Sequence, residues 1–359
     1  MKFGHFCLPT YFADVDGTVG EFTRRFVDFL VESEALGFDS LWANEHHFDA
    51  YGGIIPSPPI MLSALAQRTQ RVRLGSSIIV LPLHNPIEIA EQMAMIDLMS
   101  NGRVELGVGR GFVAYDYDRL GVSLEGAQER LKDGLELILK AWAGGSFNHR
   151  GPYYRYENLE VWPRPEQRPH PPVWLSCGGT PASFEWAGRQ GYKIMTVAYR
   201  GVEPLIKLNR LYRESWIGAG HNPNAYDISA HYQVVLAKDG REAKSIAQQA
   251  LRRYIGATTH TTDRVRADSE RTANAIHDKV VREVLDLDRM VKECRVVAGT
   301  PEEAVELLDR ACDLMGVTQV DCTFYFGGIA FEHAQRSQRL FASEVIPKLR
   351  DKTPGRPHA

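Results

Sequence analysis

Cysteine is scarce in this sequence and long apolar runs are lacking, and both features narrow the class of protein. The 359 residues include five cysteines, an odd number scattered between positions 7 and 322. This spacing does not suit a disulfide framework and is typical of reduced thiols in the cytosol. The chain has no apolar run long enough to span a membrane and begins without the apolar core of a signal peptide. We therefore predict a cytoplasmic protein with no membrane partner.

An excess of charge of one sign is lacking as well. The sequence has 42 lysines and arginines against 45 aspartates and glutamates, for a formal net charge of -3. Binding to nucleic acid requires a positive field, so we predict no nucleic-acid partner. The Gly-x-Ser-x-Gly turn of hydrolases is also missing, which argues against acyl-transfer chemistry.

The sequence does have a regular alternation of short apolar runs with amphipathic helical stretches. This pattern predicts repeated βα units and a parallel sheet. The expected strands span residues 2–8, 40–43, 72–80, 103–108, 173–177, 193–197, 231–237 and 319–324. No internal repeat or linker divides the chain. We predict an α/β fold with a single (β/α)8 TIM-type barrel over residues 1–350; a doubly wound open sheet is the alternative.

Two segments interrupt the alternation. Residues 147–172 are rich in tyrosine and proline, and we expect a small hairpin insertion there. Residues 255–292 are polar and charged. We predict that they form a mobile lid, and an exposed helical insertion is the alternative. Residues 351–359 are expected to form a short polar tail.

Three polar loops follow expected strands. Glu45-His46-His47-Phe48 places an acid and two imidazoles where α/β barrels carry their chemistry; a loop anchor or subunit contact is the alternative, and no Cys or His cluster completes a metal site. Gly107-Val108-Gly109-Arg110-Gly111 combines glycines with positive charge but lacks the spacing of a dinucleotide fingerprint. Residues 176–183, Ser-Cys-Gly-Gly-Thr-Pro-Ala-Ser, favour an anion cradle at a helix N-terminus. An ordinary βα turn is the alternative.

Taken together, these segments resemble the bacterial luciferase-like flavin monooxygenases. The likeness extends to Ser76-Ser77-Ile78-Ile79-Val80-Leu81-Pro82 and Gly299-Thr300-Pro301-Glu302-Glu303, in the family's order over nearly the whole chain. The resemblance implies that His46 is the catalytic histidine, a base titrating near neutrality. Glu45 could orient it. We assign His47 a structural or interface role, since successive side chains on an extended segment cannot both face the barrel axis.

The same resemblance implies a cofactor site. The FMN phosphate would bind at Arg110, Gly178, Gly179, Thr180 and Ser183, and a non-proline cis peptide between Ser77 and Ile78 would lie beneath the flavin ring. One departure concerns the phosphate: Gln128 stands where luciferase has a further arginine, with Arg130 two residues later. It is therefore open which second cation would balance the charge of the phosphate.

The function implied by the resemblance is an FMN-dependent monooxygenase. It would use reduced FMN as a cosubstrate and O2, through a flavin hydroperoxide, to oxygenate a small or medium apolar organic substrate. A separate flavin reductase would supply the cofactor, since no nicotinamide site is recognisable. The helix expected over residues 88–99 would form a homodimer interface. The alternatives are deazaflavin-dependent hydride transfer on the same barrel and a catalytically silent flavin-binding protein.

Overall fold

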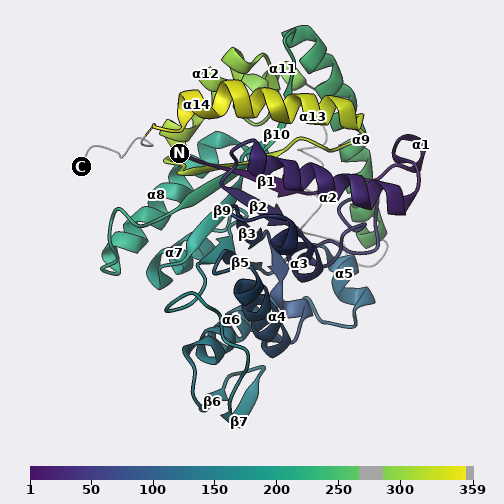
Figure 1. The fold of residues 1–359 in the computed structure, drawn as a ribbon. Helices are drawn as coiled ribbons and strands as arrows, with labels where there is room; N and C mark the ends of the chain where they lie inside the picture. Colours follow the sequence, from purple (N-terminus) through teal and green to yellow (C-terminus); the bar gives the residue numbers. More distant parts are fainter. Residues whose placement is uncertain (267–285, 353–359) are drawn as a thin grey trace.

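Parallel strands close into a barrel in the computed structural model, which describes residues 1–266 and 286–352 (Figure 1). The barrel strands are β1 (Lys2–Cys7), β2 (Ser40–Ala43), β3 (Arg73–Ser76), β5 (Val104–Gly109), β8 (Val173–Ser176), β9 (Lys193–Val197), β10 (Ile228–Leu236) and β12 (Gln319–Thr323). Each strand pairs with the next, and β12 pairs with both β10 and β1. The predicted (β/α)8 barrel is confirmed; an open sheet would leave two edge strands.

Two short strands extend this ring. β4 (Ile79–Val80) pairs with the end of β5, and β11 (Val297–Gly299) pairs with the end of β10. The predicted third strand over residues 72–80 is therefore divided, because the chain turns between β3 and β4.

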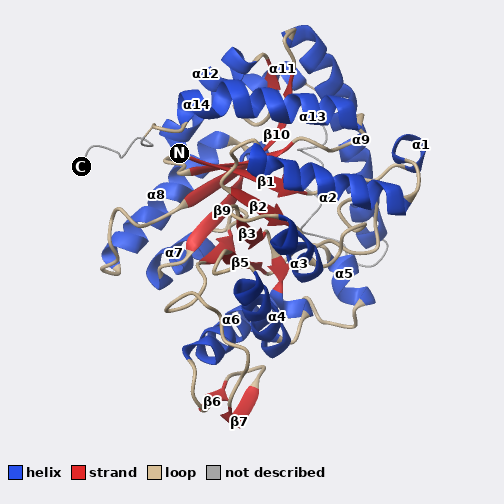
Figure 2. Cartoon of the chain, viewed as in Figure 1, coloured by secondary structure: helices blue, strands red, loops and turns tan. Residues whose placement is uncertain are grey.

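Helices cover the outside of the barrel (Figure 2). They are α1 (Ala13–Asp16), α2 (Val19–Ala35), α3 (Pro58–Arg68), α4 (Pro86–Met99), α5 (Ala114–Arg119), α6 (Ala127–Ala143), α7 (Pro181–Gln190), α8 (Val202–Gly218), α9 (Gly240–Arg266), α11 (Leu287–Lys292), α12 (Pro301–Met315), α13 (Phe331–Leu340) and α14 (Ile346–Leu349), with the shorter turns η1 (Leu81–Leu83), η2 (Ala198–Arg200) and η3 (Phe341–Val345). In α2, Thr18 and Glu21 form a capping box, and the chain leaves the helix at Gly37, whose φ is 89°. Among the described residues, no helix is long and apolar enough to cross a membrane.

A hairpin of β6 (Phe147–Arg150) and β7 (Arg155–Leu159) lies within the segment where the sequence predicts one, at the lower edge of Figure 1. The buried carboxylate of Asp133 on α6 holds it. This carboxylate accepts hydrogen bonds from His149 Nε2 at 2.7 Å and from the backbone N–H groups of Tyr153 and Tyr154 at 2.8 and 3.0 Å. The hairpin is thus fixed against the first turns of α6.

The predicted lid over residues 255–292 is in part a helix. We expect the preceding helix to end at Tyr254, but α9 continues to Arg266, and α11 begins at Leu287. Adding a residue to an existing helix is much easier than starting one, so α9 extends through a glycine and several threonines of low helix propensity. Residues 267–285 of the predicted lid lie outside the described residues.

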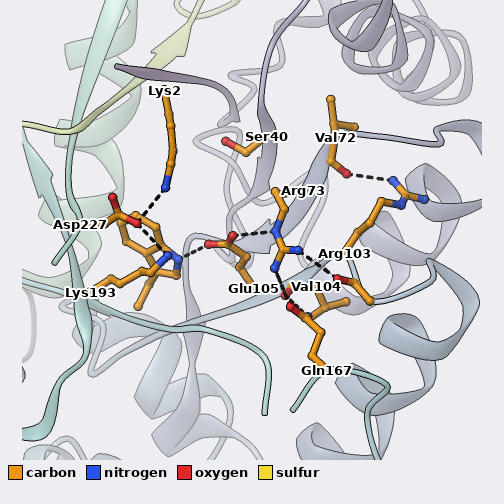
Figure 3. Close-up of polar contacts among 12 residues, drawn as sticks. Lys2, Ser40, Val72, Arg73, Arg103, Val104, Glu105, Gln167, Lys193 and Asp227 are labelled. Atoms are coloured by element: carbon orange, nitrogen blue, oxygen red, sulfur yellow. Dashed lines mark hydrogen bonds and ion pairs between the residues drawn. The ribbon is translucent and has the colours of Figure 1, made fainter. Parts of the chain in front are cut away.

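Charged side chains fill the amino-terminal end of the barrel (Figure 3). Arg73 Nε donates to Glu105 at 2.8 Å, and Lys2 and Lys193 donate to Asp227 at 3.0 and 2.8 Å. Each of these charges has a partner of opposite sign, which offsets the cost of enclosing it. This end of the barrel is a polar floor.

One further acid lies inside the barrel. Asp321 on β12 is buried, and it is hydrogen-bonded to the Ser229 hydroxyl and, at 2.9 Å, to the Gln319 amide. Burial raises the pKa of Asp321 to about 7. The barrel interior therefore favours the neutral form of this carboxyl.

Candidate active site

The predicted site residues follow the carboxyl ends of β2, β3, β5 and β8. His46 follows β2, the Ser77–Ile78 pair follows β3, Arg110 follows β5, and residues 178–183 follow β8. Because neighbouring strands are parallel, these loops share one face of the barrel, which we call the mouth. The mouth is the face on which the active sites of such barrels are built.

His46 lies partly exposed among aromatic rings at the mouth. Its ring centroid is 4.7 Å from that of Tyr51 and 6.2 Å from that of Phe112. Burial lowers the pKa of His46 to about 4, although the charge of Glu45 acts in the opposite direction. The prediction of an imidazole that titrates near neutrality is therefore not supported, since the sequence does not reveal how much of the ring its neighbours bury. At pH 7 His46 is neutral and can accept a proton.

Glu45 does not orient His46, and that prediction is wrong. The carboxylate of Glu45 is fully enclosed and accepts hydrogen bonds from His47 Nε2 at 2.9 Å, His84 Nε2 at 2.8 Å and Val80 N at 2.9 Å. Successive side chains of an extended segment face opposite ways, so Glu45 and His47 can meet while His46 turns aside. Glu45 thereby connects the loop after β2 to the segment after β3.

The charges of this cluster are mutually dependent. Burial alone would raise the pKa of Glu45, but hydrogen bonds from His47 and His84 outweigh it and lower the pKa to about 2. The same bond to Glu45 raises the pKa of His47. Glu45 is therefore an anion at neutral pH.

The peptide bond between Ser77 and Ile78 is cis, as the resemblance implied. Ser77 N donates to the Ala43 carbonyl at 2.7 Å, and its hydroxyl donates to the Met195 sulfur at 3.2 Å. Ile78 packs against a buried group of Trp42, Trp174 and Met195 inside the barrel. The pair lies above an apolar layer at the centre of the mouth.

The glycines before Arg110 have a packing role that the sequence does not show. A Cβ atom at Gly107 would lie 1.9 Å from the Ser76 carbonyl oxygen, and one at Gly109 would lie 2.3 Å from Ile78 Cδ1. These two glycines allow the segment after β3 to approach β5. Packing alone therefore accounts for Gly107 and Gly109, and no bound phosphate is needed to explain them.

Arg110 is exposed, and a second arginine lies in its neighbourhood. The Tyr117 hydroxyl donates to the Arg110 carbonyl, and although burial raises the pKa of Tyr117 to about 12, the charges of Arg110 and Arg130 both act to lower it. The guanidinium of Arg130 lies in the first turns of α6, 4.9 Å from the centre of the Tyr153 ring. Two positive charges therefore act on the same phenol, a proximity that no sequence spacing could reveal.

The loop after β8 is open to solvent. Gly178, Gly179 and Thr180 are exposed, and a Cβ atom at Gly179, whose φ is 128°, would meet nothing within 4 Å. Thr180 is the N-cap of α7, and its side chain makes no capping hydrogen bond. Since β5 and β8 are neighbours, this free helix N-terminus follows the strand adjacent to the one that carries Arg110. Ser183 lies in the first turn of α7.

Sequence reasoning missed a second histidine at the mouth. His231 on β10 is buried, its Nε2 is 2.8 Å from the Thr323 hydroxyl, and its ring centroid is 4.4 Å from that of Phe6. Burial lowers the pKa of His231 to about 3. A histidine within an apolar strand is the one signal that could have drawn attention to it.

A parallel (β/α)8 barrel with an imidazole, an exposed arginine and a helix N-terminus at the carboxyl ends of its strands has the architecture of a TIM-barrel enzyme. The profile of the luciferase-like monooxygenase family matches residues 1–319. The chain belongs to this family.

Named relatives extend over nearly the whole chain. Monooxygenase RslO1 from Streptomyces bottropensis is 31% identical, and its crystal structure superimposes with a TM-score of 0.82, covering 97% of this chain and 99% of that one. The oxygenase component of flavin-dependent trigonelline monooxygenase from Acinetobacter baylyi is 25% identical over 94% of this chain and 93% of its own. F420-dependent glucose-6-phosphate dehydrogenase from Amycolatopsis mediterranei is 28% identical over 91% and 95%. The family thus includes both flavin-dependent oxygenases and F420-dependent oxidoreductases.

Proposed function

We propose that the protein is an FMN-dependent monooxygenase that uses reduced FMN and O2 to oxygenate a small or medium apolar organic substrate. One observation carries the proposal: Arg110 and the free N-terminus of α7 follow adjacent strands at the mouth that also holds His46. Similarity to the flavin-dependent trigonelline monooxygenase component supports it.

The residues at the ends of β5 and β8 suit a flavin phosphate. Arg110 and Arg130 would balance its negative charge, and the backbone N–H of Ala182 in the first turn of α7 would donate to its oxygens, since Pro181 has no N–H. The open side of Gly179 lets a phosphate approach the backbone closely. We infer that Gly178 and the hydroxyls of Thr180 and Ser183 complete this cradle.

The remaining site residues would act on the ring and the substrate. Bound reduced FMN supplies the activation of O2. Ser77 and Ile78, above the apolar layer of Trp42 and Met195, would support the flavin ring. His46, neutral at pH 7, would accept a proton during turnover. We infer that Glu45 acts at a distance, by keeping the loops after β2 and β3 together.

The phosphate site is tested by binding. Replacing Arg110 with alanine should weaken the binding of reduced FMN by about 1.5–3 kcal/mol, the range for a hydrogen bond to a charged group. Binding of riboflavin, which has no phosphate, should not change. Arg119→Ala, which removes another exposed arginine after β5, is the matched control. Equal affinity of the unaltered protein for FMN and riboflavin would contradict a phosphate site.

A second candidate function is hydride transfer with the deazaflavin F420, which the similarity to F420-dependent glucose-6-phosphate dehydrogenase favours. The absorption spectrum and mass of the cofactor that copurifies would distinguish the two. Oxygen uptake with chemically reduced FMN, in step with product formation, would support monooxygenation. Substrate oxidation that proceeds without O2 and reduces F420 would support the alternative.

We infer two partners. A separate flavin reductase would deliver the reduced cofactor, in line with the component system of the trigonelline relative. A second copy of the chain would cover an apolar face on α3 and α4, where Ile60, Met95, Leu98 and Met99 are exposed. Replacing Met95 and Leu98 with glutamate should convert a dimer into a monomer in sedimentation velocity. An unchanged sedimentation coefficient would place the interface elsewhere.

A further inference from the structure

The ring of His46 is oriented by packing. Among the described residues no hydrogen bond to its imidazole is found, and Glu45, the neighbour best suited to hold it, is bonded to His47 and His84. Bases in enzymes are usually held by a third group that fixes their orientation. Another part of the structure must therefore supply this restraint.

Tyr51 is the ring packed most closely on His46. Its centroid lies 4.7 Å from the imidazole, at an interplanar angle of 54°. The next residue, Gly52, has a φ of 74°, and a Cβ atom there would lie 3.0 Å from His46 Cδ2. Gly52 N also donates to the Pro9 carbonyl at 2.9 Å. The loop after β2 is thus tied to the loop after β1, and Tyr51 and Gly52 lie directly against the imidazole.

A second tyrosine, from a distant part of the chain, holds the first. The hydroxyl of Tyr254 on α9 donates to the hydroxyl of Tyr51 at 3.1 Å, and the ring centroids are 5.3 Å apart. Tyr254 is buried, and its ring lies edge-on to that of Phe326, with the ring centroids 6.0 Å apart. The Tyr254 hydroxyl therefore links α9 to the loop that carries His46.

The position of Tyr254 depends in turn on how α9 is seated. The preceding residue, Arg253, donates to both carboxylate oxygens of Asp14 at 3.0 and 3.1 Å, and its guanidinium lies 4.1 Å from the centre of the Phe12 ring. Two consecutive residues of α9 therefore contact two separate segments: Arg253 contacts the start of α1 and the residue before it, and Tyr254 contacts the loop after β2. A shift of α9 would move Tyr254 relative to Tyr51.

We propose that the hydrogen-bonded pair of Tyr51 and Tyr254 is the device that positions His46, and that it couples the orientation of this base to the seating of α9. Both tyrosines are positioning residues and act through the imidazole. The proposal rests on the proposed function insofar as His46 is the base. Its structural content, that the pair restrains the imidazole, does not depend on flavin or substrate.

The test removes one hydroxyl and retains the ring. In Tyr254→Phe the bond to Tyr51 is lost, so the Tyr51 ring loosens and more water reaches His46. The pKa of His46, followed by NMR of its side-chain nitrogens and assigned with His46→Gln, should then rise from its depressed value toward about 6.5, the ordinary value for histidine. The charged groups that act on His46, namely Glu45, His47 and Asp49, remain in place in this variant.

Turnover provides a second readout. The rate of product formation by Tyr254→Phe should fall on the order of tenfold, while the affinity for reduced FMN stays within about twofold, because the phosphate site is not touched. Tyr51→Phe should have the same effect, and the double variant should be no worse than either single one, since all three lack the same bond. Tyr212→Phe, which loses a 3.0 Å bond from α8 to the Tyr192 carbonyl just before β9, should alter neither readout.

An unchanged His46 titration in both single variants, with the fold intact by circular dichroism, would overturn the proposal. If Tyr254→Phe does not fold, Tyr51→Phe removes the same hydrogen bond by changing the loop residue instead. The titration of His46 in that variant then tests the proposal. A shifted titration in a protein that never oxygenates any substrate would leave the positioning device standing and reject the proposed function.

Discussion

The side chain of His46 is neutral through the physiological range because its surroundings bury much of the ring. A base with a pKa of about 4 is lost only when the pH falls through that value. The free enzyme should therefore show no loss of kcat/KM between pH 8 and 5 from this group, whereas an imidazole titrating near 6.5 would lose most of it. A rate profile over this range, with flavin affinity measured in parallel, checks the expectation.

Removal of the imidazole separates catalysis from binding. His46→Ala should retain the affinity for reduced FMN within a few-fold, because the phosphate groups bind at other strand ends. Its rate of oxygenation should fall on the order of 10²–10⁴, the contribution of a general base. Product formation at the unaltered rate would remove His46 from the chemistry.

Glu45 is a residue whose effect should be structural. In Glu45→Gln the anion that binds His47 and His84 becomes a neutral amide, and we expect a loss of about 1.5–3 kcal/mol in the free energy of unfolding by urea. The folded carboxyl has a pKa of about 2, so the wild-type advantage is present above the unfolded value near 4.5 and fades as the pH falls toward 2. Glu157→Gln, which breaks an exposed pair with Arg150, should cost almost nothing.

At the scale of elements, β5 approaches the end of β3 closely. Gly107→Ala would place a methyl group 1.9 Å from a backbone oxygen of Ser76, and the strands would have to separate. We expect a loss of about 3 kcal/mol or more in stability. Gly256→Ala, in an open position of α9, should stabilise the protein by up to about 1 kcal/mol. Thermal unfolding of both variants measures the difference.

These elements also show what the sequence could and could not predict. Helix α2 was predictable because Thr18, Glu21 and Gly37 mark its ends locally, and the barrel followed from the repetition of such units. The hydrogen-bond partners of Glu45 could not be predicted, because an irregular loop has no periodic pattern that shows where its side chains point. The role of Gly107 was hidden for a similar reason, since it depends on a strand distant in sequence.

At the scale of the whole molecule, the enclosed Asp321 makes stability depend on pH. Its pKa is raised to about 7, so between the unfolded value near 4 and pH 7 the unfolded state loses its proton first, and stability falls as the pH rises. In Asp321→Asn the side chain cannot ionise, so the stability of the variant should not fall as the pH rises through this range. The variant should gain stability over the wild type across that window, by up to about 4 kcal/mol above pH 7, as measured by urea unfolding.

Asp227→Asn is the control of opposite sign. Burial alone would raise the pKa of Asp227, but Lys193 and Lys2 outweigh it and lower the pKa. Its anion therefore stabilises the folded state above pH 4, and Asp227→Asn should lose stability there and lose less at lower pH. A gain by both variants, or by neither, would contradict the charge states assigned to the barrel interior.

Because β1 pairs with β12, the barrel can close only after the ribosome has synthesised β12. β1 leaves the ribosome before the other barrel strands, yet its second partner, residues 319–323, follows after roughly 15–60 s at a typical rate of about 5–20 residues per second. Until then β1 has one exposed edge, which invites pairing with other chains. Nascent chains stalled before residue 319 should therefore aggregate when released without chaperones, whereas chains released after α14 should fold.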